Sequence, residues 1–208
     1  RRTPLALGCS TVMTQAPRRN NGQEREKGRP QRDRPFPEPD TARAPTGARA
    51  RSGGAGVAVG ATQGYIYLRC EYPHAQRALD AAIRTAYEHG FLGDNVGGSG
   101  KHFDLEVRLG AGAYICGEET ALLESLEGKR GQVRFKPPLP ALKGLFGKPT
   151  VINNVITFAS VPIIFERGAD WYRNFGMGRS RGTLPIQLTG NIKQGGLVEL
   201  AFGATLRE

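Results

Sequence analysis

The sequence predicts an α/β protein built on a parallel sheet, and three adjoining segments predict it. Residues 65–70 (YIYLRC) are rich in aromatic and β-branched side chains, which favour a strand. After Pro73, apolar residues recur with the 3.6-residue period of a helix that ends near Gly90. Residues 103–109 then alternate apolar and polar side chains, which is typical of a half-buried strand. A strand, a helix and a strand in this order form the crossover unit of a parallel sheet.

The middle of the chain predicts a glycine-rich turn, a helix and a long connection. The turn begins at Gly110, and the helix after it is expected to end near Glu127, before Gly128. The connection over 129–150 is rich in Lys, Pro and Gly. Such a long irregular segment inside a compact domain is usually either functional or disordered.

The C-terminal part predicts one more helix and the beginning of a second module. Asn153 is expected to be the N-cap of a helix that runs from Asn154 to about Arg167. Pro162 is expected to kink this helix. Two strands joined by a glycine-containing turn are expected to follow, at 184–190 and 197–200.

The basic charge of the chain is concentrated in its N-terminal tail. The net charge is +10, and residues 1–56 hold 12 basic and 5 acidic residues. This tail has 7 of the 14 prolines and a single aromatic residue, Phe36, so it has too little apolar surface to form a core. We therefore expect a disordered tail over 1–56, a partial α/β domain over 57–180 and a module that begins at 181–208. A transit peptide and a nucleic-acid-binding arm are alternatives, but the acids and prolines count against the first and the missing aromatics against the second.

Composition also excludes some kinds of site. No apolar run reaches about eighteen residues, so we expect no membrane-spanning helix and no direct membrane insertion. The three cysteines, Cys9, Cys70 and Cys116, are widely spaced and form no CxxC pair. We therefore expect no metal or iron–sulfur ligands within this chain. Free thiols favour a reducing compartment, and hence a cytoplasmic location.

The turn over 110–120 (GAGAYICGEET) is the strongest chemical signal. Ligands of open α/β sheets bind beyond the carboxyl ends of strands, where glycines allow close approach and a helix N-terminus offers N–H groups to phosphates. Glu118 and Glu119 are expected in the first helical turn, where the helix dipole favours acids. The same residues also suit a purely structural role, as a tight turn before a helix whose start is stabilised by acids.

Residues 110–155 (GAGAYICGEETALLESLEGKRGQVRFKPPLPALKGLFGKPTVINNV) closely resemble the flavin-carrying, NADH-oxidising subunit of respiratory complex I, the 51-kDa family. The same family includes the diaphorase subunits of NAD-reducing hydrogenases and the beta subunits of soluble NAD-dependent formate dehydrogenases. The resemblance extends over about 57–208, and 64–75 and 168–208 are most similar to the formate dehydrogenase beta subunit. A likeness over so many consecutive positions is far more specific than a short motif.

The resemblance implies an oxidoreductase subunit with FMN and NAD as cofactors. It implies a hydride passing between NAD(H) and FMN and single electrons passing on to iron–sulfur clusters, with a 4Fe-4S cluster only in the full-length family member. The implied fold is a parallel-sheet FMN-binding domain followed by a β-grasp-like (SLBB) module. The implied partners are NAD(H), a 2Fe-2S-type small subunit and, for formate dehydrogenase, a molybdenum-bearing alpha subunit, with no nucleic acid.

The resemblance also implies the residues of the site. Glu119 is the expected catalytic residue, facing the nicotinamide. No nucleophile is required, because hydride transfer is the chemistry of the cofactor and the protein supplies orientation. The implied lining of the FMN pocket is Gly110, Gly112, Tyr114, Gly117, Glu118, Glu119, Ile152, Asn153 and Asn154.

The chain departs from the family pattern at two places. Leu139 stands where family members often carry an aromatic residue that stacks on adenine. Residues 51–56 (RSGGAG) imitate the family's upstream glycine loop but lie much closer to Gly110 than that loop does, and we interpret them as coincidence. Two hypotheses follow: residues 1–56 are not native family sequence, and the chain is a scaffold that keeps the fold without the flavin.

Overall fold

The computed structural model describes residues 10–14 and 49–205, with the side chains described from residue 54 onward. The chain divides into two compact units between Asn153 and Asn154, and each is described by itself.

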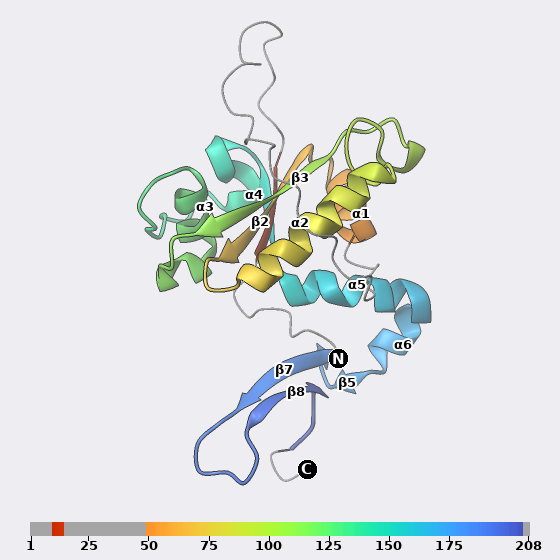
Figure 1. Cartoon of the computed structure of the whole chain (residues 1–208), viewed down its shortest axis with the longest axis vertical. Helices are drawn as coiled ribbons and strands as arrows, with labels where there is room; N and C mark the ends of the chain where they lie inside the picture. The colour runs from red at the N-terminus through yellow and green to blue at the C-terminus, as the bar shows by residue number, and fades with distance from the viewer. Residues whose placement is uncertain (1–9, 15–48, 206–208) are drawn as a thin grey trace, which may run out of the picture. The chain divides into compact units, whose positions relative to one another are not determined.

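The first unit is built on a four-stranded sheet with the strand order β3-β2-β1-β4 (Figure 1). The central pair, β2 and β3, is parallel, with Gln63 opposite Asp104, whereas β1 runs antiparallel to β2. The predicted parallel α/β fold is therefore confirmed for the pair that the sequence indicated. The strands are β1 (Ser10–Thr14), β2 (Gln63–Arg69), β3 (Asp104–Gly110) and β4 (Thr150–Asn154).

Helix α2 (Pro73–Glu88) connects the two parallel strands and packs against β3 (Figure 1). Pro73 stands at its first turn, where a missing N–H costs nothing. Near its other end, the Tyr87 hydroxyl donates to Asp104 at 3.0 Å and accepts from the backbone N–H of Leu105 at 3.2 Å. The last turn of the helix is thereby tied to the start of β3.

The other helices of this unit are short, and most of them follow β3. The glycine-rich turn contains the 3₁₀ helix η2, and two short elements lie within the 129–150 connection, so this connection is partly regular. The elements are α1 (Arg49–Val59), η1 (Val96–Gly98), η2 (Tyr114–Gly117), α3 (Glu119–Leu126), α4 (Pro140–Lys143) and η3 (Leu145–Gly147).

A buried apolar cluster holds α3 and the connection against β2. Tyr67 of β2 packs in this cluster with Leu122 and Leu123 of α3 and with Leu145 of η3. All three leucines are at most 1% exposed. Full burial of each such side chain stabilises the fold by about 1.5–3 kcal/mol. The glycine-rich turn is therefore flanked by a rigid core on the α3 side.

The structure differs from the predicted disordered tail at two pieces of 1–56. Strand β1 pairs with β2, and its sequence, STVMT, has the β-branched residues that favour a strand. Helix α1 contains the RSGGAG stretch, so this stretch is helical rather than a phosphate-binding loop. A Cβ added to Gly56 would lie 2.2 Å from the ring of Phe103, so glycine here permits close packing. The rest of 1–48 lies outside the described residues.

The described residues of the second unit form two helices and two small hairpins. Helix α5 (Val155–Arg167) contains Pro162 and is followed by α6 (Ala169–Arg173). The two strands predicted near the C-terminus are confirmed as an antiparallel hairpin. Their assignment to a β-grasp-like module stays a prediction. The strands are β5 (Gly176–Met177), β6 (Ser180–Arg181), β7 (Thr183–Leu188) and β8 (Gly196–Ala201).

The start of α5 corrects the predicted N-cap by one residue. The cap is Asn154, whose side-chain oxygen accepts from the Ile156 N–H at 2.8 Å. Asn153 belongs instead to β4. Both residues are asparagines of high capping preference, so the sequence alone could not choose between them. Among the described helices, none combines the length and the apolar character needed to cross a membrane.

Candidate functional site

The glycine-rich turn follows the carboxyl end of β3, and most of its residues are exposed. Gly110 is buried, and a Cβ there would lie 2.5 Å from the Tyr67 hydroxyl oxygen, so this glycine serves close packing. Gly112 has φ = 87°, a left-handed conformation that favours glycine. Residues 111–113 are exposed and carry nothing larger than a methyl group, and the side chain of Tyr114 beside them is 94% exposed. The turn therefore offers bare backbone next to an aromatic ring.

The two glutamates of the turn have different environments. Glu118 is the N-cap of α3, and its Oε2 accepts from the backbone N–H groups of Thr120 at 2.9 Å and Ala121 at 2.8 Å. The Thr120 hydroxyl donates to the same oxygen at 2.6 Å. Glu119 is the first helical residue and is exposed.

These contacts correct two expectations from the sequence. Glu118 lies before the first helical turn rather than within it, and only Glu119 occupies that turn. The N–H groups of Thr120 and Ala121 are already bonded to Glu118, so they are not available to a phosphate. The cause is the capping preference of an acid at this position, which satisfies the helix from within the chain.

The hydrogen bonds also set the ionisation of Glu118. Burial raises the pKa of its carboxyl group, but hydrogen bonds from Thr120, Ala121 and Lys136 outweigh burial and hold the pKa below its usual value. Glu118 is therefore a stable carboxylate with a structural task.

Lys136, from the 129–150 connection, completes a charged group at the turn. Its ammonium forms an ion pair with Glu119 and lies 3.4 Å from Glu118 Oε1. The hydrogen bond to Glu119 raises the pKa of the Lys136 ammonium. One cation thus faces both acids of the turn.

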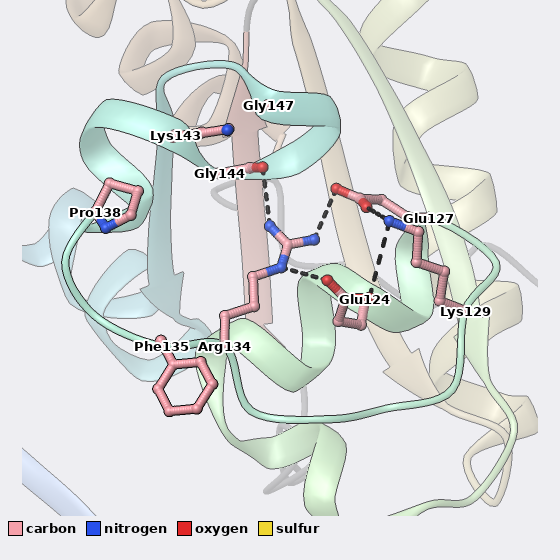
Figure 2. Close-up of a pocket in the computed structure, with 9 residues that line it drawn as sticks. All are labelled: Glu124, Glu127, Lys129, Arg134, Phe135, Pro138, Lys143, Gly144 and Gly147. Atoms are coloured by element: carbon pink, nitrogen blue, oxygen red, sulfur yellow. Dashed lines mark hydrogen bonds and ion pairs between the residues drawn. The ribbon is translucent and has the colours of Figure 1, made fainter.

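A second charged cluster is centred on Arg134, which also belongs to the 129–150 connection. Figure 2 shows the Arg134 guanidinium between Glu124 and Glu127 on one side and the Gly144 carbonyl on the other. It lies in a cavity of about 320 Å³ whose wall contains none of the predicted site residues. The wall is formed by Glu124, Glu127, Lys129, Arg134, Phe135, Pro138, Lys143, Gly144 and Gly147.

The remaining predicted residues are consecutive in the chain, and the division between the two units falls after Asn153. Ile152 is partly buried and packs against the apolar cluster formed by Tyr67, Cys116, Leu122, Leu123 and Leu145. Asn153 follows it in β4. Asn154 already has its side-chain oxygen bonded to the α5 backbone and belongs to the second unit.

The family model described as the Nuo51 FMN-binding domain matches residues 53–163. The chain belongs to this family. The match covers every element from β2 to β4 and the start of α5, and it includes all the predicted site residues. FMN binding is thus a property of the family in which the turn is found.

Relatives of the Nuo51 FMN-binding domain family are similar over most of this chain. It is 52% identical over 153 residues to the NADP-reducing hydrogenase subunit HndC of Solidesulfovibrio fructosivorans, covering 74% of this chain and 31% of that protein. It is 53% identical over 151 residues to an NADH-quinone oxidoreductase subunit of Rhizobium meliloti (strain 1021), covering 73% of this chain and 36% of that protein. The chain thus spans about a third of the length of these curated relatives. Both relatives are oxidoreductase subunits, as expected of this family.

A solved structure supports the fold. The air-oxidised NAD⁺-reducing NiFe hydrogenase has a chain that is similar with a TM-score of 0.66 at 38% sequence identity, covering 78% of this chain and 27% of that one. The H2-reduced form of an NAD⁺-reducing NiFe hydrogenase gives a TM-score of 0.63 at 40% identity. The α/β architecture is therefore shared with proteins of known structure.

Sequence reasoning misses three residues that the structure places at or behind the turn: Thr120, Arg134 and Lys136. The composition of 129–150 indicates a functional or disordered connection, but it assigns no residue of this segment to the site. The available signal is charge complementarity, because the irregular segment over 129–150 has six basic residues and no acids, and it follows a helix rich in glutamate.

Proposed function

We propose that this chain is the flavin-binding part of a subunit that takes a hydride from NADH, in an assembly of the NADH-quinone oxidoreductase or NAD-reducing hydrogenase type. The observation that carries the proposal is that the two acids of the turn have different environments. Glu118 is held by three donors, whereas Glu119 is exposed beside Lys136. Membership of an FMN-binding family supports this reading.

The residues of the turn suit a flat ring system. The exposed backbone at 111–113 carries no side chain that would obstruct a ring, and Tyr114 offers an aromatic face beside it. We assign the exposed glycines Gly112 and Gly117 to this surface as well, and the buried Gly110 to its support at the end of β3. When bound, FMN supplies the chemistry of hydride acceptance and one-electron release. The task of the protein is to hold the ring and to exclude competing positions.

Glu119 is the residue we assign to the nicotinamide side. Its carboxylate is exposed and can accept a hydrogen bond from the carboxamide N–H groups of nicotinamide, which would orient the ring for hydride transfer. Ile152 and Asn153 are proposed to line the flavin from β4, and Asn154 from the N-cap position of α5. Because the Asn154 side-chain oxygen accepts the capping bond, we assign the contact with the flavin to its amide nitrogen.

The finer assignment of the assembly favours the electron-input subunits of hydrogenase and NADH-quinone oxidoreductase, because the relatives named above are of these kinds. The formate dehydrogenase beta subunit, with its molybdenum-bearing partner, rests on the similarity of 64–75 and 168–208 and stays a prediction. A 2Fe-2S-type small subunit, a 4Fe-4S cluster elsewhere in the subunit, NAD as the physiological nucleotide and a cytoplasmic location belong to the same proposal.

Reconstitution with FMN tests the proposal. Quenching of FMN fluorescence measures binding to the full chain, and loss of visible flavin absorbance on adding NADH measures reduction. In Glu119→Gln we expect FMN affinity to be unchanged and the NADH concentration for half-maximal reduction to rise about tenfold, since a charge-assisted hydrogen bond is lost. Glu88→Gln, an exposed glutamate on α2, is the matched control and should behave as the wild type.

Three outcomes would count against the proposal or part of it. A folded wild-type chain that binds no FMN favours the scaffold hypothesis. Reduction by NADH that is identical in Glu119→Gln and wild type removes the assigned role of Glu119. Salt-sensitive DNA binding would instead favour the nucleic-acid alternative, which rests on the basic tail over 1–56.

A further inference from the structure

The Arg134 side chain forms polar contacts with three other residues: Glu124, Glu127 and Gly144. Its guanidinium donates to Glu124 Oε1, lies 2.8 Å from Glu127 Oε1 through Nη2, and donates to the Gly144 carbonyl at 3.0 Å through Nη1. The side chain is only 24% exposed, and those of Glu124 and Glu127 are 18% and 9% exposed. A planar guanidinium suits this arrangement, because its donors are fixed in one fork.

The backbone of Arg134 is anchored as well, and this anchor leads to the turn. Its N–H donates to the Thr120 hydroxyl oxygen at 2.9 Å. The same hydroxyl donates to Glu118 at 2.6 Å, and Thr120 is buried. A continuous chain of hydrogen bonds therefore runs from Arg134 through Thr120 to the first acid of the turn.

Lys136 follows Arg134 by two residues, so the anchor limits where its ammonium can lie. Two residues of extended chain span at most about 7 Å. The side chain of Arg134 is held by Glu124 of α3 and by Glu127, the C-cap of that helix, and its N–H is held by Thr120 in the first turn. Because Thr120 fixes the backbone of residue 134, the next residues of the connection must stay close to the start of α3. Lys136 reaches Glu118 and Glu119 from there.

We propose that Arg134 is a positioning residue that holds Lys136 against Glu119, and thereby sets the charge at the nucleotide side of the turn. The inference rests on the proposed function only for what the Lys136–Glu119 pair binds. The placement of Lys136 itself follows from contacts within the chain. Arg134 is assigned no contact with cofactor or substrate and acts through Lys136.

The reactivity of Lys136 toward an amine acylating reagent tests the placement without any flavin. The full chain is treated with a limiting amount of acetylating reagent, and the rate at Lys136 is measured by peptide mass spectrometry relative to exposed Lys101. In Arg134→Gln we expect the relative rate at Lys136 to rise about threefold, because its ion pair with Glu119 is no longer held. Arg134→Lys keeps a cation but loses the fork and should give an intermediate rate.

Two further comparisons keep the result specific. Arg130→Gln removes an exposed arginine from the same connection and should leave the rate at Lys136 as in wild type. If Arg134→Gln does not fold, Thr120→Val decides in its place, because it removes the acceptor of the Arg134 N–H. Thr120→Ser restores that acceptor and should restore the wild-type rate. An unchanged rate at Lys136 in a folded Arg134→Gln or Thr120→Val variant overturns the proposal.

The dependence on NADH separates this inference from the proposed function. In Arg134→Gln reconstituted with FMN, we expect KM for NADH to rise about threefold with kcat nearly unchanged, since ground-state binding is weakened. A faster acetylation rate at Lys136 with an unchanged KM supports the positioning role of Arg134, but shows that the Lys136–Glu119 pair does not face the nucleotide. A kcat loss with no change at Lys136 counts against the positioning and leaves the proposed function standing.

Discussion

The ring of Tyr67 occupies the space that a side chain at position 110 would need. A Cβ on Gly110 would lie 2.5 Å from the Tyr67 hydroxyl oxygen and 2.7 Å from Cζ. Tyr67 is 5% exposed and its hydroxyl is hydrogen-bonded to Ser125 at 3.0 Å, so the ring has little freedom to move. We expect Gly110→Ala to destabilise the fold by about 1–3 kcal/mol, as overpacked sites do. Urea unfolding followed by circular dichroism measures this change.

Gly117 is the matched control for that substitution. Nothing lies within 4 Å of a Cβ placed there. Gly117→Ala should leave the free energy of unfolding within about 0.5 kcal/mol of wild type. Equal stability of the two variants would mean that packing against Tyr67 does not require glycine at position 110.

The capping carboxylate of Glu118 predicts a pH dependence of stability. Because its pKa is lowered in the folded state, its contribution is present above the ordinary value of 4.5 and is lost as pH falls through the lower folded value. Glu118→Gln should therefore lose stability at neutral pH and lose less than wild type on further acidification below pH 4.5. Thermal melts at a series of pH values measure this. Parallel curves for wild type and Glu118→Gln would show that the cap is not ionised.

Asn154 separates capping from flavin contact, because its oxygen caps α5. Asn154→Ala should destabilise the chain by about 1 kcal/mol, the usual cost of a lost N-cap. Asn154→Ser keeps a capping oxygen but lacks the amide, so it should restore stability without restoring any contact that the amide nitrogen makes to FMN. Melting temperature and FMN affinity measured on the same samples distinguish the two roles. Weak FMN binding in the alanine variant that serine fully rescues would assign the effect to the cap alone.

Local periodicity is sufficient to predict the elements around the parallel pair. Alternation and the 3.6-residue period predict β2, α2 and β3. Each of these elements packs one face against the rest of the protein, and its apolar residues therefore recur with the period of that element. The carboxyl end of β3 is predicted to within one residue for the same reason, because the strand continues to Gly110, where the turn is expected to begin. Strand β1 escapes prediction because it is a short strand that pairs with a segment about fifty residues away, within a composition typical of disorder.

Residues of the site that depend on tertiary contacts cannot be found from the sequence. Lys136 meets Glu119, and Arg134 meets Glu124, only after the irregular connection has folded back on α3. No periodic pattern encodes such a contact. The resemblance to a family supplies the acids and glycines of the turn, whereas the basic residues that hold them emerge only from the structure.

Packing of the connection gives the last prediction, since its anchoring at Arg134 requires that the segment be part of the core. Leu145 is fully buried and Leu142, three residues earlier, is 72% exposed. Leu145→Ala should destabilise the fold by about 2–5 kcal/mol, because it leaves a cavity against Tyr67 and Leu123. Leu142→Ala should change it by less than about 0.5 kcal/mol. Urea unfolding of the two variants side by side measures the difference. If both were neutral, the connection would be detached from β2 in solution, and Lys136 could not be held at Glu119 by the contacts of Arg134.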